Sequence, residues 1–302
     1  MKIGFFPGCS LEGTAKEYQK SLLKISSLAG IELIEVDDWN CCGATAAHSL
    51  NHLLSIALPA RILALAELQG FSDLLIPCAA CYSRLITARN VILRDDKIKN
   101  KILEIIELPF ENKVNPINVI EFINKYLSEF IKSNLKFSIN QKVACYYGCL
   151  LVRPPKVLNV ERYEDPQDME SIVKILGGKP INWAYKVECC GAGLSVSRTE
   201  IVAKLSAKII EDAESRGAEA IIVACPMCQS NLDMRRNNIK KFLQRKSILP
   251  VLYITQLIGM SLGISEDDLG LKKHFVPVKI KLDETNNKVK EVKLKEEKEV
   301  LA

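Results

Sequence analysis

The sequence predicts an α/β fold of two repeated domains with parallel-type βα units, related by a pseudo-twofold axis, with a helical connector and a charged C-terminal tail. The repeat is visible because three segments of the first half recur in the same order in the second. Each half also alternates short apolar runs with amphipathic stretches, which is typical of strands and helices in α/β units. The segments begin at Lys2 and Lys142, at Cys41 and Cys189, and at Gly70 and Gly217.

The composition limits the function classes. The chain has 302 residues, 48% of them hydrophobic, and a formal net charge of +5. That length suits two domains with cores of their own, and the modest charge does not indicate a nucleic-acid binder, which normally shows a concentrated basic face. No stretch approaches the roughly 18 uninterrupted apolar residues of a membrane span, and residues 1–9 are typical of a strand and not of a signal peptide. We therefore expect a cytoplasmic protein, with peripheral membrane association through partners left open.

The elements of the first half follow from its apolar runs and its glycines. Each strand is short and apolar, and each helix ends near a glycine, where the left-handed backbone that stops a helix costs least. Pro59 is expected to bend the helix that contains it. The expected order is a strand at residues 2–6, a helix ending before Gly30, a strand at 31–36, a helix at 46–69, a strand at 73–76 and a helix from Cys81.

The second half repeats this order, and the domain boundaries follow from it. We place the first repeated domain at residues 1–90 and the second at 141–265. Residues 91–140 keep isoleucines at helical spacing and are expected to form the helical connector. Residues 266–302 are rich in lysine, which favours a flexible tail over a hairpin around Asn286 and Asn287. The second-half strands are expected near Val143, near Ile181 and at 220–223, with helices at 169–176 and 201–216.

Eleven cysteines carry the functional argument, because ten of them form two sets with the same order and similar spacing. A secreted protein would use such cysteines for disulfides, whereas a cytoplasmic one uses them as metal ligands or catalytic thiols. Cys145 is left over and lies within a strand. The first set is Cys9, Cys41, Cys42, Cys78 and Cys81, and the second is Cys149, Cys189, Cys190, Cys225 and Cys228.

The spacing favours a metal or cluster site at each set, near the carboxyl ends of the strands, where ligands of parallel sheets gather. A CxxC between a strand and a helix points both sulfurs the same way. Adjacent cysteines reach one centre only if the backbone turns sharply, and Gly43 and Gly191 follow the two pairs. Five thiolates exceed the four of tetrahedral zinc or of an ordinary cubane. An iron–sulfur cluster is therefore favoured over zinc, and zinc over dithiol chemistry.

Six motifs make the resemblance to a known family specific: FPGCS, DWNCCGATAAH, PCAACYSRL, YYGCLLVRPP, ECCGA and ACPMCQSNLDMR. They resemble the two CCG domains of the heterodisulfide reductase B subunit over nearly all of residues 1–265. The resemblance implies two noncubane [4Fe-4S] clusters, each held by the five cysteines of one set. It implies that they face each other across an active site that cleaves a heterodisulfide of coenzyme M and coenzyme B, one electron per cluster. It also implies two partners, a ferredoxin-like iron–sulfur protein that corresponds to the C subunit of that enzyme and a flavin protein that corresponds to its A subunit. Cys145 departs from the ligand pattern.

We therefore predict a catalytic iron–sulfur subunit of a heterodisulfide-reductase-like complex, an oxidoreductase that reduces or forms a disulfide or related sulfur substrate. The module also resembles subunits of sulfur-oxidising complexes and the CCG-containing subunit of some succinate:quinone reductases, which transfers electrons and docks on the membrane. That alternative predicts an amphipathic surface helix, for which only residues 251–263 are apolar enough to consider. Zinc at one motif, in a scaffold without a redox role, is a further alternative.

Four other residues have both a functional and a structural interpretation. His48 and His52 could donate protons to a leaving thiolate, but a polar helix start is favoured. Arg153 could bind an anionic group of the substrate, and a salt bridge at a loop explains it equally well. Tyr82, beside the first CxxC, is favoured as a packing residue.

Overall fold

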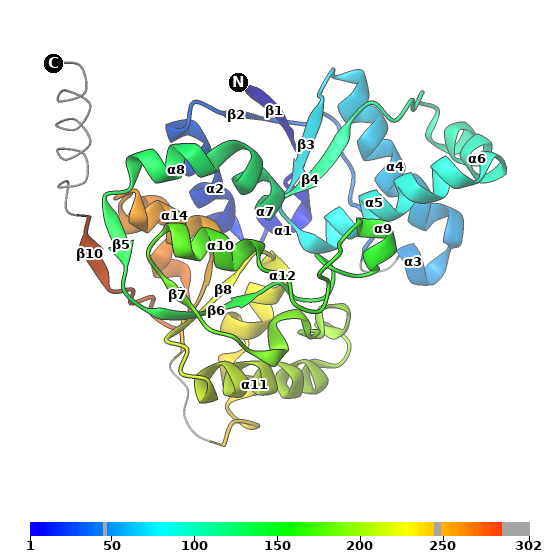
Figure 1. The fold of residues 1–302 in the computed structure, drawn as a ribbon. Coiled ribbons are helices and arrows are strands. Elements are labelled where there is room, and N and C mark those ends of the chain that lie inside the picture. Colours follow the sequence, from blue (N-terminus) through cyan, green and yellow to red (C-terminus); the bar gives the residue numbers. More distant parts are fainter. Residues whose placement is uncertain (45–46, 245–248, 286–302) are drawn as a thin grey trace, which may run out of the picture.

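The computed structural model describes residues 1–44, 47–244 and 249–285 (Figure 1). It contains one parallel four-stranded sheet in each half, with the order β2-β1-β3-β4 in the first and β7-β6-β8-β9 in the second. The repeated α/β fold is therefore confirmed, and both halves have the same topology. The strands are β1 (Lys2–Phe5), β2 (Glu32–Glu35), β3 (Asp73–Ile76) and β4 (Asn115–Asn118), then β6 (Lys142–Tyr146), β7 (Lys179–Pro180), β8 (Ala220–Val223) and β9 (Val251–Tyr253).

The central strands explain why the sheets are parallel and buried. All four residues of β3 and all four of β8 are buried, which is typical of strands covered by helices on both faces. Every pairing in the two sheets is parallel. The carboxyl ends of the strands in each sheet therefore lie along one edge, where the cysteine loops begin.

Helices connect the strands and cover the sheets. Pro59 lies inside α4, which continues past it to Leu68. The first half contains α1 (Gly8–Glu12), α2 (Lys16–Leu28), α3 (Ala47–Leu50), α4 (His52–Leu68), α5 (Ala79–Arg94), α6 (Asp96–Ile106), α7 (Val119–Phe122), a π-helical turn (Ile123–Leu127) and α8 (Ser128–Asn134). The second contains α9 (Pro155–Leu158), α10 (Asp168–Ile175), α11 (Thr199–Ser215), α12 (Pro226–Gln229), α13 (Arg236–Ile239), α14 (Ile254–Ser261) and α15 (Glu266–Leu269).

Residues 91–140, which were predicted to form a helical connector, also contain the fourth strand of the first sheet. β4 pairs with β3 in parallel, with Ile117 opposite Leu75. The helical spacing on either side is borne out by α6, α7 and α8. The sequence hid this strand because it is short and contains Pro116, which breaks the apolar pattern. The repeat thus extends through a fourth strand and the helix after it in both halves.

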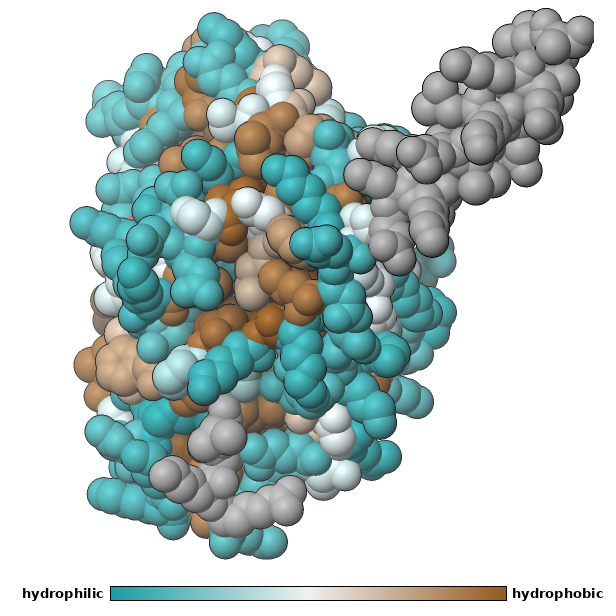
Figure 2. All heavy atoms as spheres, turned by 90° about the vertical axis from the view of Figure 1, so that its left-hand side faces the viewer, coloured by the Kyte–Doolittle hydropathy of each residue, from teal (hydrophilic) through white to brown (hydrophobic). Residues whose placement is uncertain are grey.

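The C-terminal segment also differs from the expected tail, as far as residue 285. β10 (Leu282–Glu284) pairs antiparallel with β5 (Phe137–Ile139), and α15 lies before it. The strand that pairs with β10 is therefore β5, which lies in the connector. The second strand of the hairpin considered around Asn286 would fall in residues 286–302, outside the described residues. Figure 2 shows the side of the molecule that carries β5 and β10, where apolar side chains gather between polar ones.

The two halves pack directly on each other. The ring of Tyr18, from α2, stacks on the ring of Tyr253 at the end of β9, with 4.1 Å between ring centroids. The Tyr18 hydroxyl donates to the carbonyl of Ala224, just before Cys225, at 3.2 Å. Figure 1 places α1 beside α12, the short helix that carries the second CxxC. The cysteine-bearing edges of the two sheets therefore meet at the boundary between the halves.

Candidate iron–sulfur sites

The Gly–Cys turns after β1 and β6 are shaped by close approach to the CxxC sulfurs. Gly8 and Gly148 have positive φ angles of 64° and 66°. A Cβ atom added to Gly8 would lie 3.2 Å from the Cys81 Sγ, and one added to Gly148 would lie 2.9 Å from the Cys228 Sγ. Only glycine combines this backbone conformation with the space for a neighbouring sulfur.

The Cys–Cys–Gly turns have the sharp geometry that the sequence predicts. Gly43 and Gly191 have φ angles of 74° and 82°. The backbone N–H of Gly43 donates to the Cys41 Sγ at 3.4 Å, and that of Gly191 donates to the Cys189 Sγ at 3.3 Å. Such N–H donors stabilise a thiolate in preference to a thiol.

The structure brings the predicted cysteines of the first half together. The Cys42 and Cys81 sulfurs are 3.1 Å apart. Cys42 and Cys78 are near enough to Cys81 to raise its pKa, and Cys42 and Cys9 are near enough to Cys41 to raise its pKa. Cys9 and Cys41 are exposed, whereas the other three are buried. The first site is therefore closed on its CxxC side and open on the side of Cys9 and Cys41.

The second half repeats this arrangement with a slightly wider spacing. The Cys190 and Cys228 sulfurs are 3.7 Å apart. Cys190 and Cys225 are near enough to Cys228 to raise its pKa, and Cys189 is near enough to Cys149 to raise its pKa. Cys189 is exposed and Cys149 half-buried, so this site is also open on its outer side.

The two cysteine groups approach each other at the boundary between the halves. Cys78 and Cys225, the first cysteines of the two CxxC motifs, are near enough to shift each other's pKa: that of Cys78 is raised and that of Cys225 is lowered. Both are buried, at 2% and 4% exposure. The two predicted sites therefore adjoin each other at the boundary between the halves.

The electrostatics of these groups suit a cationic centre. Cys42 and Cys78, together with burial, raise the pKa of Cys81 well above its usual value, whereas Cys41 and Cys81 lower the pKa of Cys42 to about 3. In the second half the pKa of Cys228 is raised by Cys190 and Cys225, and that of Cys225 is lowered by Cys228. Thiolates packed so closely repel each other unless a cation neutralises them, and iron would do so. Among the described residues, no three His, Cys, Asp or Glu side chains surround one point as they would a single metal ion.

Comparison with known proteins identifies the family. The model for the cysteine-rich domain called CCG matches residues 3–86 and 143–233. The chain belongs to the CCG family. Both matched regions contain one complete cysteine set, so the predicted resemblance is confirmed.

Relatives of this CCG protein are subunits of oxidoreductases. The 8-methylmenaquinol:fumarate reductase membrane anchor subunit of Wolinella succinogenes is 32% identical over 91% of this chain and 97% of its own. The B subunit of the ferredoxin/F(420)H(2)-dependent CoB-CoM heterodisulfide reductase of Methanosarcina acetivorans is 28% identical, over 91% of this chain and 94% of its own. A hypothetical protein from Helicobacter pylori has a similar fold, with a TM-score of 0.75 at 17% identity over 92% of this chain and 52% of its own. The matches support an iron–sulfur subunit of an oxidoreductase complex.

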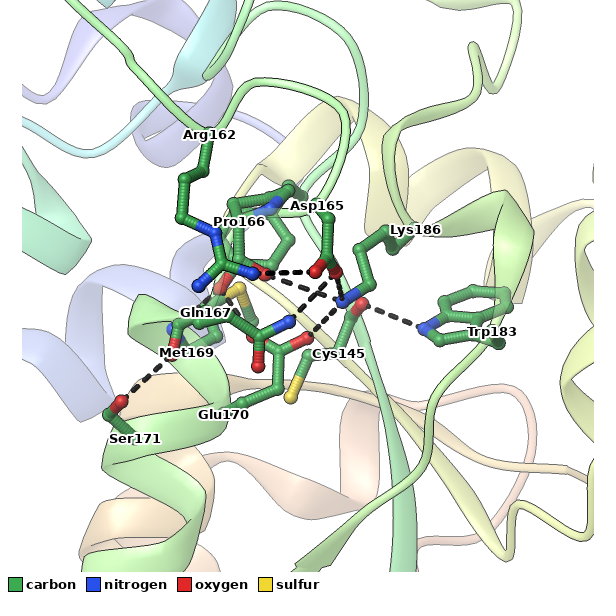
Figure 3. Close-up of polar contacts among 11 residues, drawn as sticks. Cys145, Arg162, Asp165, Pro166, Gln167, Met169, Glu170, Ser171, Trp183 and Lys186 are labelled. Atoms are coloured by element: carbon green, nitrogen blue, oxygen red, sulfur yellow. Dashed lines mark hydrogen bonds and ion pairs between the residues drawn. The ribbon is translucent and has the colours of Figure 1, made fainter.

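One buried ion-pair network supports the second site of the CCG protein, and sequence reasoning missed it. The Lys186 Nζ lies 2.9 Å from Glu170 Oε1 and 2.7 Å from Asp165 Oδ1 (Figure 3), and the Tyr147 hydroxyl donates to Glu170 Oε2 at 2.5 Å. The Lys186 carbonyl accepts from the N–H groups of Tyr147 and Gly148, at 2.8 and 3.1 Å. The network therefore ties the Gly148 turn to the segment that leads to Cys189. No local motif could reveal it, because its members are far apart in the sequence.

The remaining cysteine lies apart from both groups. Cys145 is fully buried on β6, and burial raises the pKa of its thiol well above the usual value. Its electrostatic neighbours are Glu170 and Lys186, and its carbonyl accepts from the Trp183 indole N–H at 3.1 Å. That Cys145 is not a ligand stays a prediction.

The other candidates lie in ordinary structural roles. The Arg153 guanidinium donates to the carbonyl of Val187 at 3.0 Å and pairs with Glu164 at 2.8 Å, which favours the salt-bridge interpretation. His52 is exposed in the first turn of α4, and the side chain of His48 lies outside the described part of the chain. The Tyr82 hydroxyl donates to Glu121 at 3.1 Å.

One position beside the cysteines was not considered in the sequence. The Asn231 amide, three residues after Cys228, donates to the Cys190 carbonyl at 3.2 Å and to its Sγ at 3.5 Å. Arg84 stands at the same place after Cys81, and its charge acts on Cys42. The repeat itself is the signal that could have found this pair, because both residues occupy one position of the CxxC motif.

The segment considered for membrane docking in the alternative function is buried. Every residue of α14 is buried, so residues 251–263 do not form an amphipathic surface helix. None of the described helices combines the length and apolar composition needed to cross a bilayer.

Proposed function

We propose that the protein holds two [4Fe-4S] clusters of the noncubane type, one on each cysteine set, and uses them in thiol–disulfide redox chemistry within a heterodisulfide-reductase-like complex. The observation that carries the proposal is the close approach of two sulfurs within each set of five cysteines, Cys42 to Cys81 at 3.1 Å and Cys190 to Cys228 at 3.7 Å. Two such centres suit a disulfide, because its reduction takes two electrons, whereas an iron–sulfur cluster supplies one at a time.

The residues of the chain prepare each site in three ways. The glycine turns let five sulfurs approach without clashes, and the N–H groups of Gly43 and Gly191 stabilise thiolates. Burial of the CxxC cysteines excludes water from the contact between the two sites. The exposed Cys9, Cys41 and Cys189 leave the outer sides accessible to a sulfur substrate. Electrons would come from two partners, a flavin protein and a ferredoxin-like iron–sulfur protein, as in the related complexes.

A second candidate function is electron transfer between a quinol and a partner enzyme at the membrane. It is favoured by the 32% identity to the Wolinella succinogenes membrane anchor subunit, which spans nearly the whole of both chains. The proposed clusters are the same in both cases, and the acceptor differs. The burial of α14 removes the segment considered for membrane docking, so that role would require another surface.

Anaerobic purification of the native complex tests both functions. We expect iron and inorganic sulfide in amounts that fit two clusters, and an EPR signal after mild oxidation that changes when a thiol is added. A thiol-independent signal, together with a copurified succinate dehydrogenase or fumarate reductase flavoprotein, would favour the quinol-linked function. About one zinc per half without iron would refute both functions and support the zinc alternative.

A further inference from the structure

Each half has an equivalent surface between its CxxC helix and the helix that follows its fourth strand. In the first half these helices are α5 and α7, and in the second they are α12 and α14. Tyr82 and Gln229 each follow the last cysteine of a CxxC. Glu121 and Gln256 stand at equivalent positions of the other helices, where their side chains accept the N–H of Asn118 at 2.7 Å and of Tyr253 at 2.9 Å. The two surfaces can therefore be compared residue by residue.

In the second half, the protein's own C-terminal segment covers this surface. His274 lies between Gln229 and Gln256, with its Nδ1 3.2 Å from Gln229 Nε2 and its Nε2 3.0 Å from Gln256 Oε1. The Asp233 carboxylate accepts the N–H groups of Phe275 and Val276, at 2.8 and 3.1 Å.

The surface also binds an earlier part of the same segment. The Gln256 amide donates to the carbonyl of Leu269 at 3.0 Å. Together with the bonds to Phe275 and Val276, this means that the surface recognises mainly the backbone of an irregular chain segment.

In the first half, the equivalent surface is a cavity of about 900 Å³. Tyr82 donates directly to Glu121 at 3.1 Å, with no side chain inserted between them as His274 is in the other half. The opposite wall comes from the second half, so the cavity lies at the boundary between the halves. Its lining includes Tyr82, Ile86, Glu121, Tyr147, Lys156 and Val157.

The charges around the two surfaces are also related. The covering segment begins with three acidic residues in α15. The Lys20 ammonium group of α2 donates to the Asp267 carbonyl at 2.6 Å, and Lys24 of the same helix lies 3.8 Å from the Asp268 carboxylate. The open cavity has three basic residues at its wall, Arg89, Lys125 and Lys156, and two acidic ones, Glu121 and Asp168, so positive charge is in excess. Lys156 corresponds in the repeat to Lys16, which stands beside the covered surface. An acidic chain segment suits both places.

We propose that the cavity between α5, α7 and α9 is the docking site of an acidic, irregular polypeptide segment from a partner subunit. The second half of the same chain supplies the precedent, because a polypeptide segment is seated on the equivalent surface there. A docked segment would lie beside Tyr82 and Tyr147, which are close in sequence to Cys81 and Cys149. The partner would therefore be held next to both cysteine sites.

Site-directed photo-crosslinking in the native complex tests this proposal. Leu93 lines the cavity and is 54% exposed, and Leu68, at the end of α4 and outside the cavity, is 55% exposed. Each would be replaced by p-benzoylphenylalanine in the full chain, and crosslinked peptides would be identified by mass spectrometry. We expect Leu93→p-benzoylphenylalanine to crosslink to one contiguous acidic segment of one partner subunit, at least tenfold more than the Leu68 variant.

A second pair of variants covers the case in which substitution disturbs the complex. Leu93→Glu should weaken partner binding at least tenfold, and Leu68→Glu should leave it unchanged, both with full iron content. Crosslinks from position 93 that stay within this chain while the complex is intact would overturn the proposal. So would loss of the partner crosslink on adding a small disulfide while the partner stays bound, because the cavity would then belong to a small molecule. Iron content is measured independently, so this test can fail while the proposed clusters remain.

Discussion

The two halves share the geometry of the cysteines but differ in what surrounds them. In both, two turns with positive-φ glycines and a CxxC carry the five cysteines of one set, with inner sulfur pairs at 3.1 and 3.7 Å. Around the first site, Arg84 brings a positive charge and the neighbouring surface is open. Around the second, Asn231 is neutral, a buried ion pair braces the turn, and the C-terminal segment closes the surface. Duplication thus gives two equivalent cysteine sets, and the surroundings make the two predicted sites unequal.

The largest difference between halves should appear when one inner cysteine is removed. Cys42→Ser should remove about half of the iron and sulfide, from the first site only, and Cys190→Ser should do the same for the second. The reason is that each belongs to one group of five, and a lost thiolate leaves a cluster incompletely held. Metal analysis and EPR measure this. Cys145→Ala is the control and should keep all the iron; equal losses from Cys145→Ala and Cys42→Ser would refute the assignment.

The next largest effect is expected on the stability of the protein, from the buried ion pair of Lys186 and Glu170 in the second half. Lys186→Met leaves Glu170 buried without its cation, and we expect a loss of about 3–5 kcal/mol in the free energy of unfolding. Chemical denaturation measures it. Lys204→Met, which removes an exposed pair with Glu200, should cost less than about 0.5 kcal/mol. Similar losses from the two variants would show that the buried network does not stabilise the second site.

The covered surface should respond to loss of its central side chain. His274→Ala removes two buried hydrogen-bond partners and leaves a cavity, so we expect a loss of about 2–3 kcal/mol and faster hydrogen exchange in residues 264–277. His52→Ala, at an exposed site, is the matched control and should change stability by less than about 0.5 kcal/mol.

The same residue should make docking of the C-terminal segment sensitive to pH. Burial lowers the pKa of His274, although the nearby Asp233 opposes this shift. A histidine with a lowered pKa in the folded state contributes stability that is present above its unfolded pKa of about 6.5 and lost as the pH falls below it. The protection of the amides of residues 264–277 against hydrogen exchange, measured relative to their intrinsic exchange rate at each pH, should therefore decrease below about pH 6.5 in the unmodified protein, and the His274→Ala variant should not show this decrease.

The smallest expected effect concerns the charge difference beside the cysteines. Arg84→Asn removes a cation near the first site, so reduction there becomes less favourable and the midpoint potential should fall by tens of millivolts, on the order expected for one partly screened charge. An EPR-monitored redox titration would show it for one of the two clusters only. Asn231→Arg should raise the potential of the other; an unchanged potential in both variants would mean that this position does not tune the sites.

The sequence alone determined the repeat, the α/β class and the two cysteine sets. These are local features: glycines beside cysteines, a CxxC after an apolar run, and motifs in fixed order. Such patterns act over a few residues, where backbone sterics and side-chain spacing decide the conformation. That is why the turns at Gly43 and Gly191 have the predicted geometry.

Only the tertiary structure decided which surfaces meet. The approach of Cys78 to Cys225, the pairing of β4 with β3, the pairing of β10 with β5, and the network around Lys186 all join segments far apart in the chain. Burial and packing select these contacts, and no short motif encodes them. The sequence also did not reveal that the surface of the second half is covered by His274 while the equivalent surface of the first half is an open cavity. That difference depends on where the C-terminal segment docks.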